Sequence, residues 1–307
     1  MKKNDDSKTC VAESNEQLIA SGDYNRISPT AKLIAYTRQF SDIPFAKEIA
    51  NITNSQEVLQ KLITGSDQKS ITEQLHFFSI FAESRYKSTM STIKRFNIKQ
   101  VLEFASGLSF RGPIMSDDID SYVETDLPGI MDIKFDIISK IPEIKKQLEK
   151  GNVFFHTANA LVYEEIEKTL IHFNPNMHIG IVHEGLLMYL TMKEKEIMAQ
   201  NCRKLLDKFG GVWITPDLRT KVEMEKLNKY PSGIENIKVL TGRDFNKNCF
   251  ESDEEIVEFY YNLGFDAKYV PQVDGSYEIT CSKNLNIPTE FLNELLPKFR
   301  IWTLLLR

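Results

Sequence analysis

Apolar and polar positions follow two different rhythms along this 307-residue chain. Up to about residue 98 the apolar residues recur at helical spacing, as in SPTAKLIAYTRQF and EQLHFFSIFAESRYKSTMSTIKRF. In the second of these stretches, Leu75, Phe78, Phe81 and Ala82 share one helical face. The pattern predicts three or four helices and no strand before residue 99.

After residue 99, short apolar runs alternate with amphipathic segments of helical spacing. The strand-like runs are KQVLEFA, SYVETD, NVFFHTANA, MHIGIVHEG and GVWITPD. This alternation is typical of βαβ units and therefore indicates an α/β fold with a mostly parallel sheet. Near the end of the chain, EEIVEFYYNLGF predicts a helix, and DAKYVPQ and FRIWTLLLR predict two further strands.

The same patterns predict the organisation of the chain. Residues 1–25 are polar and are expected to be disordered, residues 26–98 form an N-terminal helical cap, and residues 99–307 form a Rossmann-like domain. The section from about 219 to 252 is too long for an ordinary connection. We expect it to be a lid-like insertion over the carboxyl edge of the sheet.

Composition narrows the class of protein. With 42% hydrophobic and 26% charged residues, the chain has the composition of a soluble globular protein, and its net charge of −5 argues against general nucleic-acid binding. The four cysteines lack metal-ligand spacing and are expected to be free thiols, so no metal site is predicted. The N-terminus does not look like a signal peptide, and IGIVHEGLLMYL is too short to span a bilayer. These observations predict a cytoplasmic protein without a membrane partner.

The first predicted strand ends in a turn that could contact a cofactor. In VLEFASGLSF, Gly107 follows the strand and lets the backbone approach a ligand closely. Asp126 lies 19 residues further on, at the end of the next strand, with Glu124 two residues before it. A carboxylate at that place can accept hydrogen bonds from both hydroxyls of a ribose, although strand-end carboxylates also serve simply as turn formers.

The single glycine favours one kind of cofactor over another. A dinucleotide places its pyrophosphate against this turn, and its fingerprint has three glycines there. Here Ala105 takes the first of these positions and Ser106 the next. A cofactor with a ribose and an adenine but no phosphate fits better, and S-adenosylmethionine has that chemistry.

Three ordered motifs, VLEFASGLSFRGP, YVETDLPGIMDIK and HIGIVHEGLLMYL, resemble the leucine carboxyl methyltransferase family of class I S-adenosylmethionine-dependent methyltransferases. The resemblance covers roughly residues 28–307. It implies a Rossmann-like, seven-stranded, mostly parallel sheet flanked by helices, and an enzyme that uses S-adenosyl-L-methionine to methylate oxygen.

The resemblance also implies roles for particular residues. Arg85 would hold the carboxylate of the cofactor, Gly107 would lie beside its methionine moiety, and Asp126 would bind the ribose. Glu184 would lie beside the cofactor after the fourth strand, and Asn159 and Ala160 would flank the adenine.

Other positions are less determined. Either Lys32 or Arg38 would provide a second cation for the cofactor carboxylate, and Tyr189 would line the pocket near the methyl group. The chain departs from the family at Ala105, where a glycine is usual, and at Asn159, where an aspartate is usual. The amide carbonyl of Asn159 can still accept a hydrogen bond from the adenine amino group.

The acceptor and the chemistry at its oxygen stay open at this level. A carboxylate or a hydroxyl of a small molecule or of a protein terminus would suit the family. A hydroxyl acceptor would need a general base, for which His183 and His156 are candidates, but we expect no base to be used. Two alternatives are a catalytically silent binding module, suggested by Ala105 and Asn159, and a nicotinamide-dependent oxidoreductase. The sequence predicts neither the acceptor nor the oligomeric state.

Overall fold

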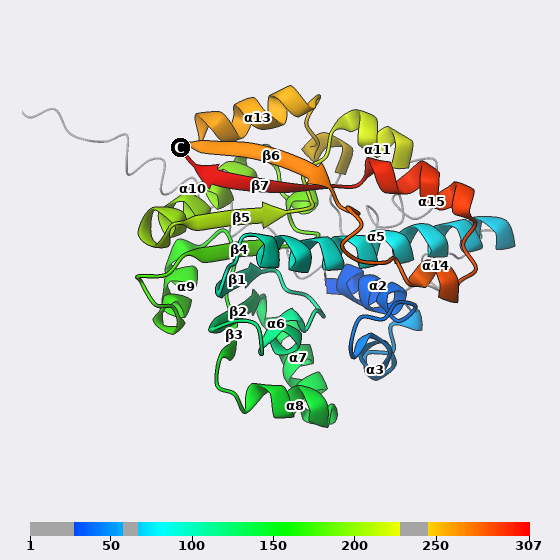
Figure 1. The fold of residues 1–307 in the computed structure, drawn as a ribbon, viewed down its shortest axis with the longest axis horizontal. Coiled ribbons are helices and arrows are strands. Elements are labelled where there is room, and N and C mark those ends of the chain that lie inside the picture. The colour runs from blue at the N-terminus through cyan, green and yellow to red at the C-terminus, as the bar shows by residue number, and fades with distance from the viewer. Residues whose placement is uncertain (1–27, 58–66, 228–244) are drawn as a thin grey trace, which may run out of the picture.

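Residues 28–57, 67–227 and 245–307 are described by the computed structural model of the chain (Figure 1). They form an α/β fold in which a seven-stranded sheet is flanked by helices. The strands are β1 (Gln100–Phe104), β2 (Ser121–Asp126), β3 (Val153–Thr157), β4 (Ile179–His183), β5 (Gly211–Thr215), β6 (Phe265–Pro271) and β7 (Arg300–Leu306). Each of them lies where the pattern of the sequence predicts a strand.

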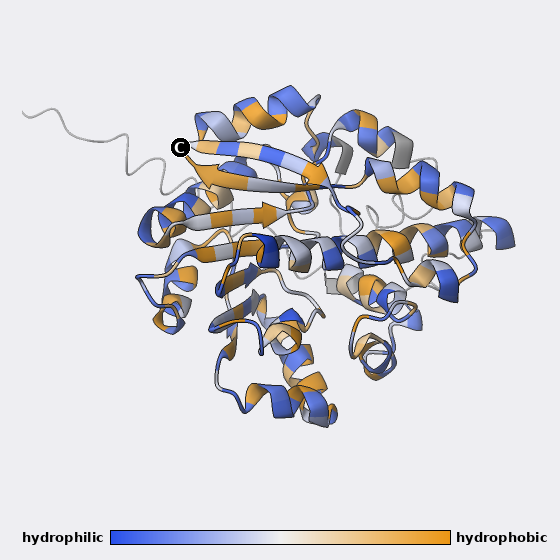
Figure 2. Ribbon diagram, in the orientation of Figure 1, coloured by the Kyte–Doolittle hydropathy of each residue, from blue (hydrophilic) through white to orange (hydrophobic). Residues whose placement is uncertain are grey.

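The strands are arranged in the order β3-β2-β1-β4-β5-β7-β6. The first five are parallel, and β7 runs antiparallel between β5 and β6. Every residue of β1, β2 and β4 is buried, because helices cover both faces of the sheet. Figure 2 shows hydrophobic residues along the sheet, with polar positions such as Glu103 and Glu124 also buried in it. Strand order reverses at β1, which pairs with both β2 and β4, and ligands of such sheets bind outside the carboxyl ends at this point.

Two helices of the sheet domain begin at residues that favour a helix start. Pro128 takes the first turn of the helix after β2, and Thr191 and Glu194 form a capping box at the start of the longest helix of the domain. The helices after β1 are α6 (Arg111–Met115), α7 (Pro128–Lys140), α8 (Pro142–Leu148), α9 (Tyr163–Glu167), α10 (Met192–Phe209), α11 (Lys221–Leu227), α13 (Asp253–Asn262), α14 (Cys281–Asn284) and α15 (Thr289–Leu295). Short 3-10 turns are η2 (Lys168–His172), η3 (Leu187–Tyr189), η4 (Phe245–Asn248) and η5 (Leu296–Lys298). The sequence pattern did not indicate α8, α11, α14 or α15.

Three helices precede the first strand in the described part of the chain: α2 (Ser28–Arg38), α3 (Ala46–Ile52) and α5 (Gln68–Arg95). Asp67 caps the 28-residue helix α5 by accepting a hydrogen bond from the Ser70 N–H. In Figure 1, α5 crosses the sheet and continues beyond the carboxyl ends of the parallel strands, where α2 packs against it. The predicted disordered segment 1–25 lies outside the described residues.

A segment between β6 and β7, residues 272–299, also returns to this cap. Glu83 in α5 accepts hydrogen bonds from the backbone N–H groups of Thr280 and Cys281 at 2.7 and 2.8 Å. Phe299 packs against Phe77 and Phe81. The sequence suggested a lid at 219–252; of that section, 228–244 lies outside the described residues. The segment that visibly packs on the cap is 272–299, which the sequence did not single out.

Candidate functional site

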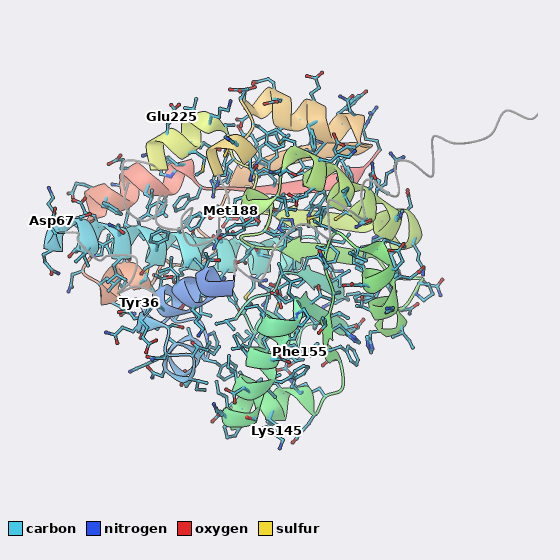
Figure 3. All side chains as sticks on the ribbon, turned by 180° about the vertical axis from the view of Figure 1, so that it is seen from behind. Tyr36, Asp67, Lys145, Phe155, Met188 and Glu225 are labelled. Carbon is cyan, nitrogen blue, oxygen red and sulfur yellow. The ribbon has the colours of Figure 1, made fainter. Side chains whose placement is uncertain are left out.

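A cavity of about 410 Å³ lies at the switch point of the sheet, between the strand ends and the cap. This volume is typical of a small-molecule site. Its walls come from α2, α5, the loops after β1 to β5 and the start of α11. In Figure 3, Met188, which lines the cavity, lies inside the molecule, whereas Asp67, Lys145 and Glu225 lie at its periphery.

The loop after β1 forms one wall and has an unusual backbone. Both Ala105 and Gly107 have positive φ angles, +47° and +56°. A glycine adopts this conformation freely, but a residue with a Cβ atom does so at a cost of roughly 1–2 kcal/mol. Lys134 of α7 supports the loop from the protein side, because its Nζ donates to the Ser106 hydroxyl and to the Gly107 carbonyl, both at 3.0 Å. The turn is therefore built with strain at Ala105 and held in place by a buried lysine.

Asp126 lies beside this loop at the end of β2. Its two carboxylate oxygens accept hydrogen bonds from the N–H groups of Gly107 and Leu127, each at 2.7 Å. Burial raises the pKa of the Asp126 carboxyl above its ordinary value, and the two backbone donors oppose that shift. Each oxygen keeps a further lone pair for a ligand donor. By contrast, Glu124 points into the protein, where it contacts Lys134 and the Gly112 N–H.

Asn159 and Ala160 line the cavity after β3. The side-chain carbonyl of Asn159 accepts a hydrogen bond from the Leu161 N–H at 3.0 Å. The backbone N–H of Asn159 donates to the Glu165 carboxylate at 2.7 Å. The oxygen that we expected to meet the adenine therefore already has one partner within the loop. It retains one lone pair for a second donor.

Glu184 lines the cavity after β4 and is held by two arginines. Its carboxylate accepts from Arg38 at 2.7 Å and also contacts Arg111, which bridges Glu184 to Glu103. The Tyr122 hydroxyl donates to the other oxygen of Glu103 at 2.8 Å. Burial raises the pKa of Glu103 to about 7, and the Arg111 charge opposes that shift. Glu184 is thus part of a buried ionic network, and the sequence did not indicate Glu103 or Arg111.

The second cation near the cavity is Arg38 rather than Lys32. Arg38 is 7% exposed and lines the cavity through its position at the end of α2. Lys32, six residues or about 1.7 turns earlier on the same helix, is half-buried and does not line the cavity. Of the two residues that the sequence left open, Arg38 lines the cavity and Lys32 does not, because side chains six residues apart on a helix point to different faces. A contact of either one with a cofactor stays a prediction.

Arg85 of α5 reaches the loop after β4. Its guanidinium is 3.9 Å from the Asp217 carboxylate and lies over the Phe81 ring at 4.1 Å, and its Nε has no hydrogen-bond partner. Burial lowers the pKa of Arg85, although Asp217 and Glu184 favour its charge. An ion pair at 3.9 Å is loose, so this guanidinium can take a further carboxylate.

Asp217, after β5, organises the loop that carries Glu184. It accepts hydrogen bonds from the N–H groups of Gly185 at 2.8 Å and Leu186 at 2.7 Å, and from His183 Nδ1 at 3.1 Å. Hydrogen bonding to His183, with the Arg85 charge, holds the pKa of the Asp217 carboxyl well below its usual range despite burial. A strand-end carboxylate in GVWITPD is the same signal that identified Asp126, so this residue could have been found from the sequence.

Of the aromatic and histidine candidates, Tyr189 lines the cavity, whereas His183 and His156 do not. Tyr189 lines the cavity and is 5% exposed; burial raises its pKa to about 12. His183 is fully buried, where its Nε2 accepts from Trp213 at 3.0 Å. His156 lies 2.7 Å from His172 beside a separate hollow at the edge of the sheet. Neither histidine lines the cavity between the sheet and the cap.

Within residues 28–57, 67–227 and 245–307, no group of three or more His, Cys, Asp or Glu side chains is arranged to hold a metal ion. No helix in this part of the chain combines the length and the apolar character that crossing a bilayer requires.

Comparison with solved structures shows the class of fold. The chain is similar to a DUF574 family protein from Streptomyces avermitilis, with a TM-score of 0.55 and 10% identity over 89% of this chain and 96% of that one. It is also similar to a putative methyltransferase from Thermobifida fusca, with a TM-score of 0.52 and 14% identity over 89% and 94% of the two chains. The fold is therefore that of the class I methyltransferases. No family model matches the sequence, and no curated protein does.

Proposed function

We propose that the protein is an S-adenosyl-L-methionine-dependent methyltransferase that transfers a methyl group to a carboxylate or hydroxyl oxygen of a small molecule or a protein terminus. One observation carries the proposal. The cavity at the switch point joins Asp126, the turn at Ala105 and Gly107, and Arg85. A carboxylate suits the two hydroxyls of a ribose, and a guanidinium suits the carboxylate of an amino acid.

The residues present fit this cofactor. Arg85 has a buried Nε without a hydrogen-bond partner, and both oxygens of Asp126 can accept a further hydrogen bond. Gly107 has no side chain, so a ligand can approach the backbone of the loop closely. Its φ of +56° also favours glycine at this position. Asn159 and Ala160 would then flank the adenine, and Arg38 would hold Glu184 in place beside the cofactor.

When bound, the cofactor supplies an electrophilic methyl group on a sulfonium. The task of the chain is to align an acceptor oxygen with that methyl group and to exclude water. The cap would serve both tasks, because α2 and α5 cover the strand ends and place Phe78 and Phe81 in the cavity wall, in the same apolar cluster as Tyr189. We expect the acceptor oxygen to be ionised without help from a histidine.

A second candidate function is a silent module that keeps the fold without turnover. The strained Ala105 and the engagement of Glu184 by Arg38 and Arg111 favour it, because both reduce what the site offers to a ligand.

Isothermal titration calorimetry with S-adenosylhomocysteine, S-adenosylmethionine and NAD tests the proposal. We expect micromolar binding of the first two, on the order of −8 kcal/mol, and none of NAD. Tight binding of NAD alone would overturn the proposal in favour of an oxidoreductase. Absence of binding by all three would favour the silent module.

A further inference from the structure

The part of the cavity under the cap is apolar and contains a buried cation. Its walls include Leu33, Phe77, Phe78, Phe81, Met188 and Met224. Arg219, which follows β5, lines the same cavity and is 4% exposed. An arginine at such a place is costly unless an anion or several acceptors meet its donors.

The guanidinium of Arg219 makes few hydrogen bonds within the protein. Its Nη1 donates to the Lys298 carbonyl over 3.5 Å, and its buried Nη2 has no hydrogen-bond partner. Among the described residues, no carboxylate lies within 4.0 Å of it. The neighbouring Glu223 is occupied by Arg300 and by the Thr220 N–H. Burial lowers the pKa of Arg219, yet an arginine keeps its charge in proteins.

Aromatic rings hold this cation without neutralising it. The guanidinium lies 5.6 Å from the centre of the Phe81 ring and 5.7 Å from that of Phe299. Such contacts favour a cation at this position but give no acceptor to its unpartnered Nη2. The site is therefore preorganised for an anionic group that reaches it from an apolar environment.

Arg85 and Arg219 both contact the Phe81 ring, but their guanidinium groups have different further neighbours. Arg85 lies against Gly185 in the loop after β4, where an added Cβ atom would be 3.2 Å from its Nη1. Arg219 packs towards Phe299, in the segment between β6 and β7. The cofactor carboxylate is thus expected at Arg85, next to the strand-end loops, and a second anion at Arg219.

We propose that Arg219 anchors a carboxylate of the methyl acceptor, so that the acceptor is an apolar molecule with an acidic group. The inference rests on the proposed function and specifies its substrate class. Both oxygens of a carboxylate held by a guanidinium fork are engaged, which makes them weak nucleophiles. This carboxylate is therefore the anchor, and the oxygen that accepts the methyl group lies elsewhere on the acceptor.

Calorimetry with matched probes tests the anchor in the presence of saturating S-adenosylhomocysteine. The probes are octanoate, octanamide and octylamine, with 5-phenylpentanoate and its amide as a second apolar body. We expect the wild type to bind each carboxylate at least about tenfold more tightly than its amide, and to bind octylamine least. Arg219→Met should remove this preference, Arg219→Lys should retain part of it, and Arg95→Met, at an exposed arginine of α5, should leave it unchanged.

The same titrations separate the anchor from the cofactor site. Arg219→Met should change the affinity for S-adenosylhomocysteine by less than about twofold, because Arg219 is not expected to contact the cofactor. Loss of a guanidinium that binds the cofactor carboxylate would reduce the affinity by more. A loss of about tenfold or more would show that Arg219 holds the cofactor and would overturn the anchor. Equal binding of carboxylates and amides by a wild type that binds S-adenosylhomocysteine would also overturn it. If S-adenosylhomocysteine does not bind, the proposed function fails, and the probes titrated alone still decide the role of Arg219.

Discussion

Two arginines, both nearly inaccessible to solvent, differ in the partners that the protein gives them. Arg111 is fully buried between Glu103 and Glu184, under the strand-end loops. Arg219 is 4% exposed under the cap and has no ion-pair partner in the described part of the chain. The first arginine completes an internal network, and the second leaves donors available.

This difference separates the two halves of the cavity. In the half formed by the loops after β1, β2 and β4, ion pairs and hydrogen bonds such as those of Glu184 and Asp126 fix the loop geometry before any ligand arrives. In the half formed by the cap, the walls are apolar. Glu223 and Asp217 favour the charge of Arg219, but no carboxylate of the described residues forms an ion pair with it within 4.0 Å. The first half is thus fixed mainly by interactions between protein groups, whereas in the second half the Nη2 of Arg219 has no protein acceptor.

The largest expected effect comes from removing the paired arginine. Arg111→Met leaves Glu103 and part of Glu184 as uncompensated buried charges, and we expect the free energy of unfolding to fall by about 3–5 kcal/mol. Arg219→Met is the matched control, because it removes a buried cation without stranding a carboxylate. It should raise the free energy of unfolding by about 1 kcal/mol in the absence of ligand. Urea denaturation measures both, and equal losses in the two variants would contradict the distinction.

The next effect is on the affinity for the cofactor. Asp126→Ala removes the acceptor for a ribose and the support for the Gly107 and Leu127 N–H groups. We expect S-adenosylhomocysteine to bind about 100-fold more weakly, which corresponds to two charge-assisted hydrogen bonds at about 1.5 kcal/mol each. Asp126→Asn, which keeps one carbonyl acceptor, should reduce the affinity for S-adenosylhomocysteine less than Asp126→Ala does. Unchanged binding by the alanine variant in calorimetry would remove Asp126 from the site.

A smaller effect, dependent on pH, concerns the loop after β4. The pKa of Asp217 is lower in the folded protein than in the unfolded chain, so the stabilisation by its charge is complete above an unfolded pKa of about 4. This stabilisation is lost as pH falls from there towards the folded pKa. Asp217→Asn should therefore lower the free energy of unfolding by about 2 kcal/mol at pH 7 and by less at pH 3. Denaturation at pH 7, 5 and 3 gives the difference, and a constant gap would show that the charge of Asp217 is not involved.

The half of the cavity formed by the strand-end loops could be predicted further than the half formed by the cap. Strands and their carboxyl ends follow from short apolar runs, so Gly107, Asp126 and Glu184 could be placed at one edge of the sheet before the structure was known. Asp217 carried the same signal and was missed. Arg219 had no signal, because its surroundings come from α5 and from residues 272–299, which only the tertiary fold brings together.

The register of helices set a second limit. Lys32 and Arg38 both occur in a helix that the sequence predicts, but which side chain reaches the cavity depends on how α2 packs against α5. The helices of the cap could be predicted, but the residues with which they line the cavity could not. Helical spacing identifies the apolar face of a helix without identifying the element that packs against it.

The smallest expected effect concerns the turn at which the half of the cavity formed by the strand-end loops begins. Ala105 has a φ of +47°, which costs a residue with a Cβ atom roughly 1–2 kcal/mol. Ala105→Gly relieves this strain but adds backbone entropy to the unfolded chain, worth about 0.5–1 kcal/mol. We therefore expect a net gain of about 0.5 kcal/mol in the free energy of unfolding.

Ala160→Gly is the control for that substitution, because Ala160 lines the same cavity without a positive φ. It should be destabilising by about 1 kcal/mol, from backbone entropy and the removal of a buried methyl group. If Ala105→Gly also strengthens the binding of S-adenosylhomocysteine, the methyl group of Ala105 narrows the cofactor site. If only stability changes, Ala105 strains the turn without closing it. A loss of stability equal to that of Ala160→Gly would contradict the strain at Ala105.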